Sequence, residues 1–279
     1  MILVADPAAL ARSTSHVSRA DVVVVIPARY GSSRFIGKPL ARIGDKPLVQ
    51  QVYDRVSTAR GVKRVIVATD DERILTVVQN FGGTAMITGQ DLRTGSDRVA
   101  HIAQEVPADV YINLQGDEIP LAAGFLEDLI FPFIGSDADV GTLKRAMTDE
   151  RELTDPNVVK VVTDEQGFAL YFSRSPIPYV RDGPAGRTVL SAGLHWKHLG
   201  IYAYTRGALI RFAGLPAGSL ERSEQLEQLR LLEAGIRIRV WETKHESLRI
   251  DTPSDLQRAE QALTQGSTRG EPACHNSSL

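Results

Sequence analysis

The chain has 279 residues, enough to bury a full core in one large domain or two small ones. Apolar residues make up 43% and charged residues 24%, which argues against a disordered or collagen-like chain. A formal charge of −2 offers no general attraction to nucleic acid or to an anionic membrane, so we expect neither as a partner.

The two ends of the chain differ in composition from the middle. Residues 1–20 lack the basic start and apolar core of a secretion signal, and we expect a flexible arm there. Residues 267–279 are polar and are expected to form a flexible tail. No stretch approaches the roughly 20 apolar residues of a membrane helix. The single Cys274 excludes an internal disulfide and fits a reducing cytoplasm. We therefore expect one cytoplasmic domain over residues 21–266.

The first ordered stretch is expected to be a strand that leads into a phosphate-binding loop. Five consecutive β-branched residues, Val22 to Ile26, predict a strand buried on both faces, and Pro27 is expected to end it. The loop after it holds three cations and two glycines: Arg29, Arg34, Lys38, Gly31 and Gly37. A cationic, glycine-bearing loop at the end of a buried strand favours several phosphates, although a solvated surface turn is the commoner origin of a basic loop. A Walker A loop is excluded, because five residues separate the glycines and a proline replaces its hydroxyl residue.

Helices and strands alternate through the first half of the chain. We expect helices over 47–58, from about 70 to 81 with Thr69 or Asp70 as its cap, and over 94–104. Strands are expected over 64–68, 85–87 and 110–114. This alternation predicts a Rossmann-like, doubly wound α/β fold.

An acidic pair, Asp117 and Glu118, follows the strand over 110–114. A carboxylate at the end of a strand is common and by itself a weak signal. Opposite a loop of cations, however, it is the arrangement that a metal-dependent reaction of a triphosphate needs, because a carboxylate can anchor Mg²⁺.

The second half is antiparallel in character. Strands are expected over 158–162, 168–174, 198–204 and 237–241, and helices over 207–212, over 222–233 and from Pro253 to about Leu263. We expect the region of about 155–220 to form a smaller antiparallel lobe beside the main sheet. From the residues alone, His198 is an ordinary strand histidine, Glu227 and Gln228 are helix surface, and Asp251 is a helix cap as readily as a metal ligand.

Six segments together resemble one family. They are IPARYGSSRFIGKPL (26–40), QGDEIPL (115–121), YFSR (171–174), HLGIYAY (198–204), LEQLR (226–230) and IDTPSDL (250–256). This set resembles the 3-deoxy-manno-octulosonate (Kdo) cytidylyltransferases, which are sugar nucleotidyltransferases. The chain departs from the usual family pattern at Phe35-Ile36, at Ile119 and at Arg249, which stands where the family commonly has glycine.

The resemblance implies a mixed sheet of the nucleotide-diphospho-sugar transferase type, a homodimer, and the Mg²⁺-dependent reaction of CTP with Kdo to give CMP-Kdo and pyrophosphate. It implies catalytic roles for Lys38, Arg29 and Asp117, and metal binding by Asp117 and Asp251, with Glu118 as a candidate support for the metal. The implied nucleotide-binding residues are Pro27, Ala28, Arg29, Ser32, Arg34, Lys38, Thr69, Asp70, Gly95, Ser96, Arg98 and Gln115. The implied acceptor-binding residues are Arg174, His198, Tyr202, Glu227 and Gln228.

Two alternatives stay open at this point. The first is a paralogue that transfers CMP to another anionic acceptor, such as an amino-modified Kdo, a different ulosonate or a phosphonate, and it is motivated by the departures from the family pattern. The second is a non-catalytic nucleotide-binding module. That module predicts the loss of one metal carboxylate, whereas Asp117 and Asp251 are both present.

Overall fold

The structure is a computed structural model that describes residues 20–31, 35–92, 94–181, 190 and 193–267. Its strands are β1 (Val22–Ala28), β2 (Arg42–Ile43), β3 (Lys46–Pro47), β4 (Arg64–Thr69), β5 (Ala85–Ile87), β6 (Val110–Leu114), β7 (Glu118–Pro120), β8 (Val140–Ala146), β9 (Lys160–Thr163), β10 (Ala169–Ser173), β11 (Trp196–Thr205), β12 (Arg239–Glu242) and β13 (Ser247–Arg249). Its helices are the 3₁₀ turn η1 (Lys38–Leu40), α2 (Leu48–Ser57), α3 (Glu72–Asn80), α4 (Gly95–Glu105), α5 (Gly124–Ile134), α6 (Glu150–Thr154), α7 (Arg206–Gly214), α8 (Ser219–Glu224), α9 (Leu229–Glu233) and α10 (Pro253–Ser267).

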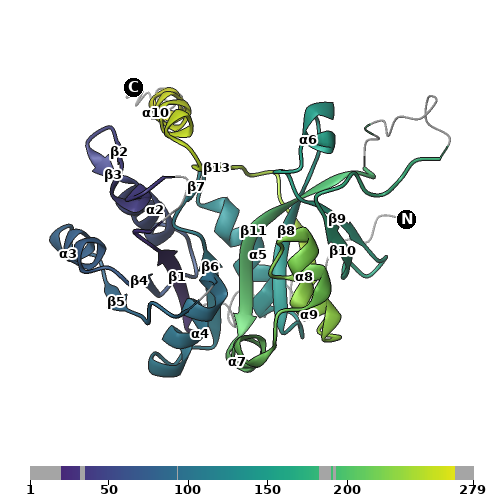
Figure 1. Ribbon diagram of the computed structural model, residues 1–279, viewed down its shortest axis with the longest axis horizontal. Helices are drawn as coiled ribbons and strands as arrows, with labels where there is room; N and C mark the ends of the chain where they lie inside the picture. The colour runs from purple at the N-terminus through teal and green to yellow at the C-terminus, as the bar shows by residue number, and fades with distance from the viewer. Residues whose placement is uncertain (1–19, 32–34, 93, 182–189, 191–192, 268–279) are drawn as a thin grey trace, which may run out of the picture.

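A nine-stranded sheet runs through the centre of the molecule (Figure 1). Strands β6, β1, β4 and β5 are parallel neighbours in that order. This is the predicted Rossmann-like unit. Strand β11 continues the sheet antiparallel to β6, and it also pairs with β8 and β9. Three of the strands predicted in the second half, β9, β10 and β11, pair antiparallel and extend the same sheet, whereas the fourth, β12, pairs parallel with β8.

Both faces of β1 are covered, which explains its uninterrupted β-branched run. Val22, Val24 and Ile26 pack with helices α2, α3 and α5 on one face. Val23 and Val25 pack with α4, α7 and α9 on the other face. Because successive side chains of a strand point to opposite faces, a strand buried on both sides needs apolar residues at every position.

Pro27 does not end the first strand as predicted. β1 continues through Pro27 to Ala28, in register with Ala68 and Thr69 of β4. Proline removes only one donor, and here it lies one residue from the end of the strand. Its carbonyl oxygen accepts a hydrogen bond from the backbone N–H of Gly116, 3.2 Å away. That bond links β1 to the turn after β6.

Two helix predictions need correction. Asp71, rather than Thr69 or Asp70, caps α3, because its carboxylate accepts the N–H of Arg73. The helix expected over 222–233 is two short helices, α8 and α9, separated at Gln225, which adopts a left-handed conformation (φ 52°). Helical periodicity does not reveal such a break, since the leucines that suggested the helix, Leu226 and Leu229, lie after it and are buried.

Sequence patterns also missed several elements, of which four position or support the site. These four are α5, the strand β8 and the short antiparallel pair of β7 with β13. Helix α5 is apolar over most of its length and carries an internal proline, Pro132, so it has little helical contrast between its faces. Within the described residues, no helix combines the length and apolar character needed to span a membrane.

Gly141 of β8 provides a test of the packing between sheet and helix. A Cβ atom at this position would lie 2.5 Å from the ring of Trp241 and 2.8 Å from the ring of Phe133. We expect Gly141→Ala to lower the free energy of unfolding by about 1–3 kcal/mol, because the rings must move. Gly207 in α7 has no atom within 4 Å of that position, so Gly207→Ala should be neutral or stabilising by about 0.5 kcal/mol. Urea unfolding of both variants measures the difference, and equal effects would contradict this packing.

Candidate active site

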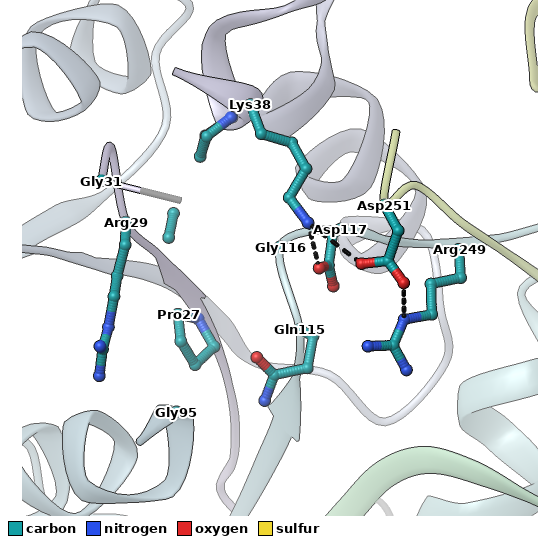
Figure 2. Close-up of a pocket in the computed structure, with 12 residues that line it drawn as sticks. Pro27, Arg29, Gly31, Lys38, Gly95, Gln115, Gly116, Asp117, Arg249 and Asp251 are labelled. Atoms are coloured by element: carbon teal, nitrogen blue, oxygen red, sulfur yellow. Dashed lines mark hydrogen bonds and ion pairs between the residues drawn. The ribbon is translucent and has the colours of Figure 1, made fainter. Parts of the chain in front are cut away.

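A polar cleft lies at the carboxyl ends of β1 and β6 (Figure 2). This is the edge at which doubly wound sheets bind ligands. The cleft, which we call the nucleotide cleft, is lined by Pro27, Ala28, Arg29, Gly31, Lys38, Pro39, Gly95, Gln115, Gly116, Asp117, Arg249 and Asp251.

Lys38 connects the two predicted metal carboxylates. Its Nζ lies 2.5 Å from Oδ2 of Asp117 and 3.7 Å from Oδ1 of Asp251 (Figure 2). It also donates to the carbonyl oxygen of Ile250 at 2.9 Å. The three side chains are between 13% and 24% exposed, so this charge cluster is only partly screened by solvent. Residues from three distant parts of the chain thus meet around one amino group.

The pairing of β13 with β7 brings Asp251 to this cluster. In that pair Arg249 lies opposite Glu118, and the N–H of Ile250 donates to the carbonyl oxygen of Asp117 at 2.9 Å. The capping role that the sequence left open for Asp251 is filled by Asp255, whose Oδ2 accepts the N–H groups of Asp251 and Thr252 at 2.8 and 2.7 Å. Burial alone would raise the pKa of Asp255, but these donors outweigh it and lower that pKa.

The chemistry of Asp117 and Asp251 suits a divalent cation. Mg²⁺ in nucleotide sites is held by one or two carboxylates, and water and phosphate oxygens complete its shell. Both carboxylates already lie within ion-pair distance of one positive group. Among the described residues, no group of three or more His, Cys, Asp or Glu is placed to hold a metal ion.

Glu118 takes a different role from its neighbour. Its side chain is buried and accepts a hydrogen bond from the Ser247 hydroxyl. Burial raises the pKa of the Glu118 carboxyl. The carboxyl therefore ties β7 to β13, and it supports the position of Asp117 and Asp251 through the backbone.

The predicted nucleotide-binding residues fall into three groups. Pro27, Ala28, Arg29, Lys38, Gly95 and Gln115 line the nucleotide cleft. Ser32 and Arg34 lie outside the described residues. Thr69, Asp70, Ser96 and Arg98 are not among the lining residues.

Arg98 shows why this last group lies away from the cleft. Its side chain is fully buried and donates to Asp70 at 2.6 Å and to the hydroxyl of Thr88. Ser96 is likewise buried and donates to Glu227 at 2.7 Å. In this structure these residues hold α4 against the neighbouring strands and reach the cleft only through other groups.

A second cleft, which we call the acceptor cleft, adjoins the first. The two share Gly95, Gln115, Asp117 and Arg249 as lining residues. All five predicted acceptor-binding residues line the second cleft: Arg174, His198, Tyr202, Glu227 and Gln228. It also contains residues that the sequence analysis did not single out, which include Asn157, Lys197 and Ser247. Lys197 directly precedes His198 in β11. Nothing in the spacing of residues there distinguishes it from a lysine of an ordinary strand.

Two buried polar groups in the acceptor cleft have no hydrogen-bond partner. The hydroxyl of Tyr202 and Nε2 of Gln228 are both unsatisfied within the described part of the chain, and each residue is only 4% exposed. An unpaired buried polar group costs roughly 1–3 kcal/mol. Groups of this kind, lining a cleft, are suited to a ligand that brings its own hydroxyls.

His198 and Glu227 are shifted away from their charged forms. Burial lowers the pKa of His198 to about 3, so its ring is neutral at physiological pH. Nε2 of His198 lies 3.0 Å from the hydroxyl of Thr142. Burial also raises the pKa of Glu227. These residues can exchange hydrogen bonds with neutral hydroxyls.

Arg174 supplies fixed positive charge at the far side of the same cleft. Its Nε, Nη1 and Nη2 donate to the carbonyl oxygens of Glu224, Pro156 and Gln225, at 2.7, 2.8 and 3.3 Å. These bonds hold the guanidinium plane in place. A guanidinium has five donors, so two remain for a ligand.

The chain matches known proteins over most of its length. The family model described as "Cytidylyltransferase" matches residues 23–238. A 3-deoxy-manno-octulosonate cytidylyltransferase from Trichlorobacter lovleyi is 48% identical over 88% of this chain and 100% of its own, and one from Geobacter sulfurreducens is 46% identical over 87% and 99%. A solved structure described as CMP:2-keto-3-deoxy-manno-octonic acid synthetase complexed with CTP is 43% identical, covers 88% of this chain and 99% of its own, and has a TM-score of 0.82. The predicted family resemblance and the nucleotidyltransferase fold are confirmed.

The low pKa of His198 leads to a prediction for stability. The unfolded histidine titrates near pH 6.5 and the folded one near 3, so only the unfolded chain gains a proton between these values. The free energy of unfolding therefore falls as the pH falls from 6.5 toward 3, by up to about 1.4 kcal/mol per pH unit from this group. His198→Gln should reduce this loss in urea unfolding at about pH 7, 6 and 5. His101→Gln, which removes a partly exposed histidine paired with Glu105, is the control and should not reduce it; equal slopes in all three proteins would contradict the assignment.

Proposed function

We propose that this chain, which belongs to the cytidylyltransferase family, transfers CMP from CTP to Kdo and releases pyrophosphate. The observation that carries the proposal is the pair of adjoining clefts. One holds the phosphate-loop cation Lys38 and the two carboxylates, and the other holds unpaired hydrogen-bond groups suited to a sugar. The wall that they share is where the two substrates would meet.

In this reaction the acceptor hydroxyl oxygen forms a bond to the α-phosphorus of CTP. The bond from that phosphorus to the bridging oxygen breaks, pyrophosphate leaves with the electron pair, and the hydroxyl proton passes to water. The chain's contribution is to position both substrates in line and to neutralise charge on the phosphates through Arg29 and Lys38. Pro27, Ala28, Gly95 and Gln115 would shape the nucleotide side.

On the acceptor side, the proposed residues divide by charge. Arg174 would pair with the carboxylate of the sugar, since a guanidinium offers two parallel donors to a planar anion. His198, Tyr202, Glu227 and Gln228 would exchange hydrogen bonds with the sugar hydroxyls. The neutral state of His198 and the unpaired groups of Tyr202 and Gln228 support this division.

We propose Asp117 and Asp251 as the residues that hold Mg²⁺. When bound, the ion would stabilise negative charge on the phosphates. The Lys38 amine lies within ion-pair distance of both carboxylates, which offsets the repulsion between them. The assignment agrees with a metal held jointly by protein and triphosphate.

We further propose a homodimer that works in the cytoplasm, where CTP is made and used. Strand β10 lies at the edge of the sheet and carries Leu170, which is 62% exposed, and an uncovered edge strand is a surface that a second chain can cover. Light scattering of the purified chain measures the assembly directly. A monomeric mass at micromolar concentration would refute the dimer.

The test of the function is pyrophosphate release with each nucleoside triphosphate against a panel of acidic sugars. We expect turnover with CTP and Kdo at roughly 1–10³ per second and far less with other pairs. If turnover is faster with an amino-modified Kdo, another ulosonate or a phosphonate, that compound rather than Kdo is the acceptor. No pyrophosphate with any acceptor would refute enzymatic activity.

A second experiment compares a variant of Lys38 with variants of the two carboxylates, by turnover and by Mn²⁺ affinity. Lys38→Ala should reduce turnover about a hundredfold, yet binding of Mn²⁺ as a probe should not weaken, because the amine competes for the same carboxylates. Asp117→Asn and Asp251→Asn should each reduce turnover and also weaken Mn²⁺ binding. Calorimetry measures Mn²⁺ affinity independently of turnover. If Mn²⁺ affinity is unchanged in both Asn variants, the metal assignment is wrong.

A further inference from the structure

Arg249 is a further cation in the site. It belongs neither to the phosphate loop nor to the predicted acceptor-binding residues. It lines both clefts, and it shares that position with Gly95, Gln115 and Asp117 alone among the described residues. It comes from β13, where the backbone pairing with β7 fixes its place opposite Glu118. Its side chain is 58% exposed, so it lies at the surface of the cleft.

One edge of the Arg249 guanidinium is anchored and the other is available. Nε lies 3.1 Å from Oδ2 of Asp251, whose Oδ1 faces Lys38 (Figure 2). In the part of the chain that the structure describes, Nη1 and Nη2 donate to no hydrogen-bond acceptor. Figure 2 shows this end of the side chain directed into the cleft, toward the space beside Gln115 and Asp117. A guanidinium held at Nε keeps its terminal N–H groups oriented for a ligand.

The unused N–H donors of Arg249, rather than net charge, favour an anion at this position. Asp117 and Asp251 bring two negative charges to the site, and Lys38 and Arg249 bring two positive ones. Lys38 is occupied in this state by Asp117 and the carbonyl oxygen of Ile250. The terminal N–H groups of Arg249 are therefore the donors that the shared wall offers to an incoming anion.

We propose that Arg249 binds the phosphoryl group that passes from the nucleotide to the acceptor. The inference rests on the proposed function, because the shared wall is where the α-phosphate would meet the acceptor hydroxyl. As the new oxygen–phosphorus bond forms and the bond to pyrophosphate breaks, the non-bridging oxygens of this group carry the charge. Two parallel N–H donors from one guanidinium match two such oxygens.

An acceptor carboxylate is the other anion that Arg249 could meet. The acceptor cleft already holds Arg174, whose guanidinium is fixed by three carbonyl oxygens. It also holds Lys197, paired with Glu152 at 2.5 Å. Arg249, in contrast, belongs equally to the nucleotide cleft and is tied to the proposed metal carboxylate. These positions assign the phosphoryl group to Arg249.

The experiment compares Arg249→Gln and Arg249→Lys with the parent enzyme, and Arg151→Gln is the matched control. Arg151 is 92% exposed, pairs with Asp149 at a helix end, and is not among the lining residues of either cleft. We expect Arg249→Gln to lower kcat about a hundredfold while the acceptor KM changes less than about twofold, since the contact strengthens in the transition state. Arg249→Lys should recover part of kcat because it keeps the charge but not the paired donors. Arg151→Gln should match the parent.

Each contrary result identifies a different role. A raised acceptor KM with normal kcat would overturn the proposal and make Arg249 a receptor for the acceptor's anion. Unchanged kinetics would also overturn it. Mn²⁺ affinity and thermal unfolding are measured on the same variants, and a loss in either that accounts for the fall in kcat would replace the proposal with an indirect effect. Failure of the parent enzyme with CTP and every acceptor would instead refute the proposed function.

Discussion

The ion pairs of Lys38 with Asp117 and Asp251 are the interaction on which the rest of the site depends. The Lys38 amine, which comes from η1, gathers groups from the turn after β6 and from the segment before α10. Such a cluster is stable because each carboxylate has a cationic partner, and leaving one of them unpaired in a partly buried site would be costly. The same property makes the cluster suited to exchange its own cation for a metal and a triphosphate.

The turn that carries Asp117 is built by backbone contacts. The N–H of Gly116 bonds to Pro27, and the carbonyl oxygen of Asp117 accepts from Ile250. A Cβ at Gly116 would lie 2.8 Å from the carbonyl oxygen of Pro27, so a larger residue does not fit without a backbone shift. The distance between Lys38 and the two carboxylates that we propose as metal ligands is thus set by the backbone.

The two clefts differ in how they prepare for their ligands. The nucleotide cleft satisfies its charges internally, through Lys38 and Arg249. Among the described residues, the acceptor cleft leaves the Tyr202 hydroxyl and Nε2 of Gln228 without a hydrogen-bond partner, and burial keeps His198 neutral. Charged groups cannot remain unpaired at such depth, whereas a few neutral polar groups can, at modest cost. The nucleotide cleft is thus suited to a triphosphate, and the acceptor cleft to a polyhydroxy acid.

The sequence by itself determined the elements that depend on neighbouring residues. The β-branched run of β1, the helix caps and the alternation of strands and helices follow from local sterics and periodicity, and the motifs around Lys38, Asp117 and Asp251 identified the family. Only the tertiary structure decided which of these residues meet. Lys38 and Ile250 lie 212 positions apart, and the sheet order that joins them has no local signal. Burial likewise withdrew Arg98 into the core and the β7–β13 pairing turned Arg249 into the cleft, because depth and direction depend on long-range packing that no short stretch of sequence encodes.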